Sequence, residues 1–283
     1  MGTAVRRVAL AAAASFLIGL LPIGVASADT IQLLNQNFDG MNNAGIAAVP
    51  AGWRVERLST VRALGAYTSA GTLTTASGGT NLPTNASQGS YNFFLNDITI
   101  ADGTENAVGF LSSGTTGTQS GNLYTKLTNS GATGITSLNI NYDVEKYRNG
   151  TNAAGFRFEL FYSTTGAINS WTSAGPTFVT AFGADLNNNG FASAPGTTIN
   201  VSNTLNVPIA AGDSLYLAWN YSVASGNTVT NAQALAIDNV SIIGNTPSQA
   251  ESVPLPLPAM AGLALMSTFW FGRPRRRRTN ALA

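Results

Sequence analysis

The chain has 283 residues, 44% of them hydrophobic and 10% charged, and a formal net charge of +1. Seven of its fourteen basic residues lie near the two ends, so residues 29–250 contain twelve acidic and seven basic side chains, a net charge of −5. Because this acidic middle has no cationic surface from which to release counterions, no nucleic-acid partner is expected.

The sequence contains neither cysteine nor histidine. An exported domain without cysteine cannot use disulfide bonds, so its stability must come from a hydrophobic core, which a chain of this length can supply. The absence of histidine excludes Ser-His-Asp and Cys-His catalysis, the usual zinc sites and the commonest acid/base group near neutral pH. With these forms of catalysis excluded, the chain is not expected to be an enzyme and no catalytic residue is assigned, although three carboxylates are considered below.

Residues 1–28 are typical of a secretory signal peptide. Arg6 and Arg7 form its positive region, an apolar run follows, and Ala26 and Ala28 form a small-residue cleavage site. Signal peptidase is the expected partner there, and the mature chain should begin at the next residue. The alternative is an uncleaved N-terminal membrane helix, which the well-formed cleavage site disfavours.

Segments that alternate apolar and polar residues occupy much of the middle of the chain. Residues 137–145 read SLNINYDVE, residues 155–163 read GFRFELFYS and residues 214–223 read SLYLAWNYSV. Each has the period of two expected of a half-buried β-strand. Gly- and Asn-rich turns separate the segments, and no long helical pattern occurs. Residues 29–244 are therefore predicted to form one all-β domain, an antiparallel two-sheet sandwich.

Two stretches lack this pattern. Residues 68–90 hold almost no apolar periodicity and are predicted to form a long exposed loop. Residues 245–252 are polar and are interpreted as a short linker into a C-terminal segment, residues 253–283.

The C-terminal segment combines a proline motif, an apolar run and a block of arginines. The apolar run, about sixteen to eighteen residues, is barely long enough for a transmembrane helix through a hydrocarbon core of about 30 Å. The arginines that follow would stop transfer and stay in the cytoplasm, so the folded domain would be exported across the cytoplasmic membrane. The membrane is thus an expected partner only through this segment, before processing.

The same segment resembles the PEP-CTERM family of bacterial sorting signals, in its VPLPA variant. The matching residues are Val253, Pro254, Pro256 and Pro258 in the proline motif and Arg273, Arg275, Arg276, Arg277 and Arg278 in the arginine cluster. The resemblance implies recognition by an exosortase, a membrane-embedded cysteine protease or transpeptidase. It also implies a place at the cell surface or in the extracellular matrix of a Gram-negative bacterium that makes extracellular polysaccharide. The doubled LPLP leaves the cleaved bond open, and the alternative is a plain membrane anchor.

The domain resembles the secreted jelly-roll modules of the MAM and cleaved-adhesin groups. The residues that carry this resemblance are Phe38-Asp39-Gly40, Pro50 and Gly52-Trp53 near the start, and Ala236-Ile237-Asp238-Asn239-Val240 near the end. A jelly-roll topology is what the resemblance implies, and it agrees with the sandwich expected from the strand pattern.

Asp238 alternates with apolar residues in ALAIDNVSII, and a buried carboxylate is costly unless it is paired or binds a metal. In the resembled modules the first and last strands lie together and can supply calcium ligands. We therefore predict that Asp39 and Asp238 share a structural Ca²⁺, a hard ion that takes oxygen ligands. The alternative is that Asp238 accepts backbone hydrogen bonds at a strand end.

A second acidic motif, DLNNNG at residues 185–190, begins like an EF-hand loop. Gly196 occupies the twelfth position, where a bidentate glutamate is needed, so the motif is interpreted as an Asn-rich turn.

Asp143, Glu145 and Glu159 are the best candidates for acid/base work. Asp143 and Glu145 share one strand face about 6.5–7 Å apart, a spacing that a two-carboxylate glycosidase can use. Basic neighbours such as Lys146 and Arg157 favour the alternative, solvated ion pairs without catalysis.

The leading hypothesis is a non-enzymatic exported surface or matrix protein with a structural or adhesive role in a polysaccharide environment such as a biofilm. A carbohydrate-binding module, with polysaccharide as partner, is the second hypothesis. Eight aromatic rings are considered as platforms for sugars, although most of them are expected in the core: Tyr91, Phe93, Phe94, Tyr124, Trp171, Phe178, Phe182 and Phe191. A glycan-cleaving enzyme that uses Glu145 or Glu159 is the third hypothesis.

Overall fold

The computed structural model describes residues 29–41, 47–71, 73–74, 87–95, 105–114, 117–191 and 194–248. Within the chain, Ala28–Ser248 form one compact unit. The expected signal peptide, most of the linker and the sorting segment lie outside the described residues. Among the residues that are described, no helix is long and apolar enough to cross a membrane.

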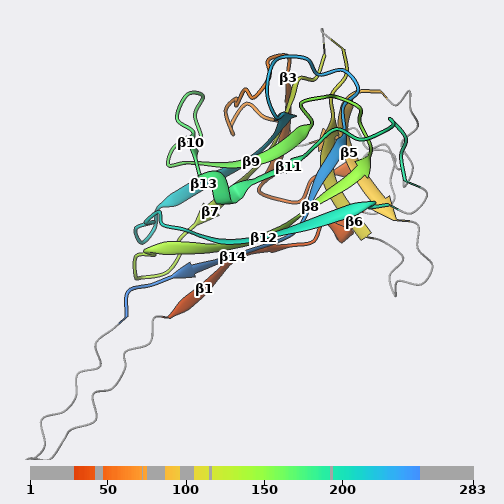
Figure 1. Ribbon diagram of the computed structural model, residues 1–283. Helices are drawn as coiled ribbons and strands as arrows, with labels where there is room; N and C mark the ends of the chain where they lie inside the picture. Colours follow the sequence, from red (N-terminus) through yellow and green to blue (C-terminus); the bar gives the residue numbers. More distant parts are fainter. Residues whose placement is uncertain are drawn as a thin grey trace, which may run out of the picture. The chain divides into compact units, whose positions relative to one another are not determined.

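Two antiparallel sheets pack against each other around a single main core (Figure 1). The sheet here called the β8 sheet has the order β12-β8-β14-β6-β5, with β1 also paired to β14. The other, the β13 sheet, has the order β10-β9-β13-β7-β3, with β11 paired to β9. The bounds in the β8 sheet are β1 Thr30–Gln36, β5 Gly89–Leu95, β6 Glu105–Leu111, β8 Ser137–Arg148, β12 Thr197–Leu205 and β14 Ala234–Asn245. Those in the β13 sheet are β3 Trp53–Leu58, β7 Ser120–Thr128, β9 Phe156–Ser163, β10 Thr172–Ser173, β11 Val179–Phe182 and β13 Ser214–Val223.

Four short elements complete the described fold: a strand pair of β2 Ala47–Ala48 with β4 Leu73–Thr74, and the 3₁₀ turns η1 Asp39–Met41 and η2 Pro176–Phe178. Because β4 and the first residues of β5 fall within residues 68–90, the prediction of one long loop there is partly wrong. The predicted all-β sandwich is confirmed.

Strand β8 shows why these sequences form a sandwich. Leu138, Ile140, Tyr142 and Val144 are at most 1% exposed and face the core, as their alternation predicts. Burying each such side chain stabilises the fold by about 1.5–3 kcal/mol. The residues between them lie on the outer face of the sheet, where the adjoining strand β12 presents mostly polar side chains.

The core between the sheets is rich in aromatic side chains. Trp53 stacks on Trp219 with ring centroids 5.5 Å apart, and the ring of Phe38 meets Trp53 edge-on at 4.9 Å. Five of the rings considered as sugar platforms are buried as well, namely Tyr91, Phe93, Tyr124, Phe178 and Phe182. The expectation that most of these rings belong to the core is therefore confirmed.

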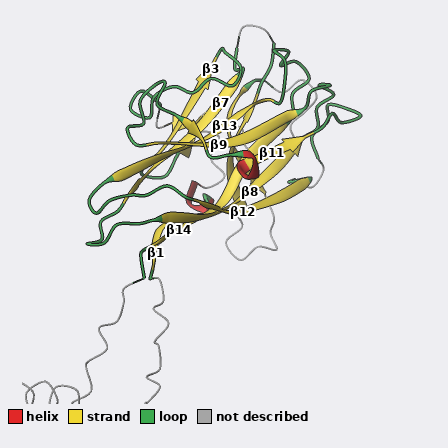
Figure 2. Cartoon of the chain, turned by 60° about the vertical axis from the view of Figure 1, so that its left-hand side comes forward, coloured by secondary structure: helices red, strands yellow, loops and turns green. Residues whose placement is uncertain are grey.

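Both ends of the sandwich domain lie at the same end of the β8 sheet (Figure 2). Thr30, the first residue of β1, pairs with Asn245, the last residue of β14. The amide of Thr246 also donates to the carbonyl of Asp29 at 2.9 Å. We call this the terminal end of the sandwich. The connections from β8 to β9 and from β13 to β14 lie at the other end, here called the distal end.

Candidate metal centre

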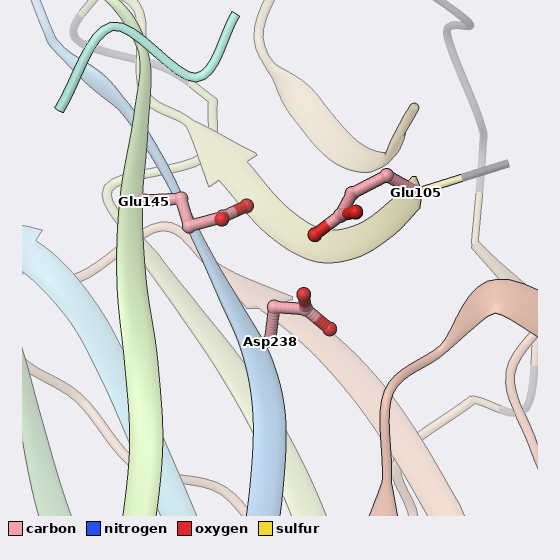
Figure 3. A group of neighbouring side chains, drawn as sticks. All are labelled: Glu105, Glu145 and Asp238. Atoms are coloured by element: carbon pink, nitrogen blue, oxygen red, sulfur yellow. The ribbon is translucent and has the colours of Figure 1, made fainter. Parts of the chain in front are cut away.

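Three carboxylates from three neighbouring strands point toward one another (Figure 3). Glu105 is the first residue of β6, Glu145 lies in β8 and Asp238 lies in β14. Each contributes an oxygen atom that lies within 4.8 Å of the other two. Because like charges this close repel strongly, the carboxylate cluster requires either bound protons or a cation.

The strand pairing explains how these side chains meet. Strand β6 pairs with β14 at Leu235, Ala236 and Ile237, whereas β1 pairs with the same edge of β14 from Val240 onward. Asp238 lies at the point where one partner strand leaves and the other begins, so the first residue of β6 can approach it. On the other edge of β14, β8 brings Glu145 opposite Ala236.

A β-bulge in β14 determines to which face of the sheet the Asp238 side chain points. Asp238 pairs with Asp143, but Ser241 pairs with Asn141, so β14 contains one residue more than β8 over this stretch. The extra residue reverses the alternation of faces. The assumption that Asp238 shares a face with Val240 and Ile242 is therefore wrong, because the carboxylate lies on the same face as the polar residues of β8.

Asp238 is nevertheless buried, with 1% of its surface exposed. The backbone amide of Asn239 hydrogen-bonds to its carboxyl group, as the alternative interpretation expected. Its Oδ1 atom, however, has no hydrogen-bond partner among the described residues. Burial, together with the charge of Glu145, raises the pKa of Asp238 to about 9. A buried acceptor without a donor is costly, and this one lies in a cluster of carboxylates.

Glu145 is 3% exposed and lies beside aromatic rings. The Tyr147 hydroxyl donates to its Oε2 at 2.7 Å, and the Tyr147 ring stacks on Phe93 with a centroid distance of 4.2 Å. Burial raises the pKa of Glu145 to about 7, the Tyr147 hydrogen bond opposes that rise, and the charge of Glu105 adds to it. The ligand set contains only oxygen atoms, which suits a hard cation such as Ca²⁺.

Asp39, the other predicted calcium ligand, lies next to the carboxylate cluster but is not one of its three members. Its Oδ1 accepts the backbone N–H of Asn106 at 3.1 Å, and its other oxygen accepts the side-chain amide of Asn37. Its charge contributes to the raised pKa of Asp238. The structure thus brings Asp238 together with Glu105 and Glu145 and leaves Asp39 at the side.

Two residues beside the cluster have left-handed backbone conformations. Phe38 has φ 58° and Asn239 has φ 51°, and neither is glycine. Asparagine tolerates this region, whereas a bulky residue such as phenylalanine seldom adopts it. The packing of Phe38 against Trp53 holds that conformation, and the next residue, Asp39, is thereby presented toward β6. Such conformations concentrate at functional sites.

The other acid/base candidates have structural partners. The carboxylate of Asp143 accepts the amides of Asn200 at 2.7 Å and Asn239 at 3.1 Å. Glu159 forms an ion pair with Arg157 at 2.6 Å and accepts the hydroxyl of Ser173 at 2.8 Å. The contact of Glu159 fits the ion-pair interpretation, whereas Asp143 is held by neutral amides and has no ion pair among the described residues.

Asp185, the acidic residue of the DLNNNG motif, also has protein partners. Asp185 forms an ion pair with Lys146 at 2.7 Å and accepts the backbone N–H of Gly150 at 2.9 Å. The side-chain amide of Gln233 donates to the same carboxylate at 2.7 Å. Asp185 thus holds the distal loops together, in agreement with the interpretation of this motif as a turn.

The fold defines the protein as an antiparallel β-sandwich with a buried carboxylate cluster. No family model and no curated protein matches the chain. It is similar to the K3 cleaved adhesin domain of Lys-gingipain from Porphyromonas gingivalis W83, with 17% identity over 75% of this chain and 99% of that domain and a TM-score of 0.40.

Carbohydrate-binding modules are also among the similar structures. A xylan-binding domain of CBM 22 has 8% identity over 79% of this chain and 97% of its own, with a TM-score of 0.36. The mannan-recognising module TmCBM27 has 10% identity over 77% and 100%, with a TM-score of 0.34. These likenesses are too distant to support an argument about function.

Proposed function

We propose that this chain is a non-enzymatic exported protein, displayed at the cell surface or in the extracellular matrix of a Gram-negative bacterium, with a structural or adhesive role. The observation that carries the proposal is the pairing of Thr30 with Asn245 at the terminal end. The expected signal peptide and sorting segment would both join the domain there. Signal peptidase and an exosortase would then process both junctions while the distal end stays clear of the membrane.

The proposal includes a structural calcium ion held by Glu105, Glu145 and Asp238, with Asp39 beside them. A bound ion would supply the positive charge that the cluster lacks and would link β6, β8 and β14. A cysteine-free domain gains from such a link, because any ligand that binds only the folded state stabilises it.

Cell fractionation of two forms of the full chain tests the display proposal. One form is the wild type, and the other has alanine in place of Arg273 and Arg275–Arg278. We expect wild-type protein to leave the cytoplasmic membrane with an intact mass that shows cleavage after Ala28 and within the proline motif. The arginine variant should remain membrane-associated and uncut at its C-terminus. Equal release of both forms would contradict the sorting signal, and retention of the uncut wild type would indicate a plain anchor.

Carbohydrate binding is the second candidate function, and the outer face of β8 and β12 favours it. Exposed amides and hydroxyls alternate there: Asn200 donates to Asn141 at 3.0 Å and Thr204 donates to Asn139 at 2.9 Å. These amides and hydroxyls, with the carboxylate of Asp143 among them, could hydrogen-bond the hydroxyls of a polysaccharide. Pull-down by insoluble polysaccharides should retain the protein, and failure of every polysaccharide to retain it would contradict this function.

A further inference from the structure

A pocket of about 410 Å³ lies at the distal end, between the β8–β9 connection and the β13–β14 connection. Its volume is within the range of small-molecule binding sites. The lining includes Thr151, Asn152, Ala153, Ser225, Thr228 and Thr230, and none of its residues carries a charge. We call it the distal pocket.

The β8–β9 connection forms one wall of the distal pocket, and it is hydrogen-bonded to the β13–β14 connection, which forms the other wall. Asn152 is 6% exposed, and its side-chain amide donates to the carbonyls of Thr228 at 2.9 Å and Thr230 at 2.8 Å. Its backbone N–H donates to the carbonyl of Asn231 at 3.2 Å. Gly150 permits this approach, because a Cβ there would lie 2.4 Å from the Asn231 carbonyl oxygen. The two connections therefore form one fixed unit.

The β13–β14 connection, the other wall, is braced by Arg62 from the connection that follows β3. The guanidinium of Arg62 donates to the carbonyl of Val223 at 3.2 Å and to the carbonyl of Gly226 at 2.8 Å. The charge of Arg62 is therefore engaged in holding the connection. A pocket with walls held in this way loses little conformational entropy when a ligand binds.

The groups at the pocket surface determine the class of ligand. Ser225, Thr228 and Thr230 are exposed, and within the described part of the chain their hydroxyls have no protein partner. The methyl groups of Ala153 and Ala154 add a small apolar surface. Hydroxyl groups beside a small apolar patch match the hydroxyls and C–H groups of a sugar, and no lining group would balance the charge of an anionic ligand.

We propose that the distal pocket binds a neutral glycosyl unit of a polysaccharide, which makes the distal end the ligand-binding end of the sandwich. This inference rests on the carbohydrate-binding function proposed above, places the ligand in the distal pocket rather than on the outer face of β8 and β12, and adds the ligand class. The pocket lies at the opposite end of the sandwich from the terminal end, where the C-terminal segment joins the domain.

Affinity electrophoresis of mature protein, recovered from cells that express the full chain, tests the proposal. The probes are soluble xylan, mannan and mixed-linkage glucan as neutral polymers and polygalacturonate as the anionic polymer. Ala153→Trp would fill the mouth of the pocket from an exposed position, and Ala211→Trp, at an exposed turn of the terminal end, is the matched control. A second variant, Thr228→Val with Thr230→Val, removes two hydroxyls and keeps the shape.

We expect at least one neutral polymer to retard the wild type and the Ala211 variant equally. Ala153→Trp should weaken this binding at least tenfold, and the double valine variant should weaken it several-fold. If Ala153→Trp binds as the wild type does, the distal pocket is not the site, although carbohydrate binding elsewhere would survive. Retardation only by polygalacturonate, or by no polymer, would overturn the proposal, while display at the surface would still be decided by cell fractionation.

Discussion

Two buried polar networks, one on each sheet, differ in how their groups are satisfied. On the β13 sheet the Tyr124 hydroxyl donates to Glu56 at 2.7 Å and accepts the N–H of Gly65 at 2.9 Å, while Asn220 donates to Asn122 at 2.6 Å. On the β8 sheet, Asp238 Oδ1 has no partner among the described residues. The first network is complete with protein groups alone, whereas the second lies in a carboxylate cluster that needs bound protons or a cation. Trp219 Nε1 on β13 also has no partner among the described residues, so the place of Asp238 among three carboxylates, and not its orphaned atom alone, distinguishes the β8 sheet.

The largest expected effect is the response of the β8 sheet to calcium. Calcium at one hundred times its Kd should stabilise the wild type by about 2.7 kcal/mol relative to EDTA, because the ion binds only the folded state. Asp238→Asn removes one ligand charge and should abolish this increment. Urea unfolding with and without calcium measures both quantities.

In EDTA the wild type should lose its advantage in stability over the Asp238→Asn variant. Asp238→Asn should be at least as stable as the wild type there, because the variant no longer brings a third carboxylate into the carboxylate cluster. A variant that loses the same stability in calcium and in EDTA would show that Asp238 acts only through its hydrogen bond with Asn239.

The pH dependence of the calcium-free protein should be the next largest effect. The pKa of Asp238 is near 3.9 when unfolded and about 9 when folded, so over this range the folded state holds a proton that the unfolded state has lost. The free energy of unfolding in EDTA should therefore fall as pH rises, by roughly 2.5–3 kcal/mol between pH 6 and pH 8 from Asp238 alone.

Calcium competes with that proton, so its affinity should rise over the same pH interval. Calcium titrations at pH 6 and pH 8 measure the change. A calcium-free protein with constant stability across this interval would contradict the raised pKa.

The hydrogen-bond network around Tyr124 on the β13 sheet should be insensitive to calcium. Tyr124→Phe leaves Glu56 and the N–H of Gly65 without the hydroxyl, which should cost about 1–2 kcal/mol. The loss should be the same in calcium and in EDTA, as measured by urea unfolding. A loss that depends on calcium would mean that the two sheets are energetically coupled, and it would contradict this prediction.

Asp39→Asn should have the smallest effect. Its carboxylate lies outside the three-membered cluster, and the amide that replaces it can still accept the N–H of Asn106. Calcium affinity should fall less than tenfold in isothermal titration. Complete loss of binding would make Asp39 a direct ligand, as the sequence predicts.

Much of the fold follows from local patterns. The alternation in β8, β9 and β13 predicts those strands because burial on one face alone stabilises a strand of period two. Strand β4 could not be found in this way, because two residues carry no period.

The site could be predicted only in part. The lone acid among apolar residues identifies Asp238, but the β-bulge that turns it to the other face depends on pairing with β8, which no local pattern records. Glu105 begins a strand after a stretch without periodicity, and its approach to Asp238 depends on where β1 and β6 exchange places along β14. For Glu145 the sequence offers an acid/base role or an ion pair, because its cluster partners Glu105 and Asp238 come from strands remote in sequence.

Calcium titration of the mature protein by calorimetry tests the central claim most directly, with Asp143→Asn as the matched control for Asp238→Asn. Asp143 lies opposite Asp238 on the neighbouring strand, and its carboxylate is not part of the carboxylate cluster. We predict one calcium site in the wild type, the same site with nearly unchanged affinity in Asp143→Asn, and no binding in Asp238→Asn. A wild type that binds no calcium, or an Asp238→Asn variant that binds it as tightly as the wild type, would contradict the account.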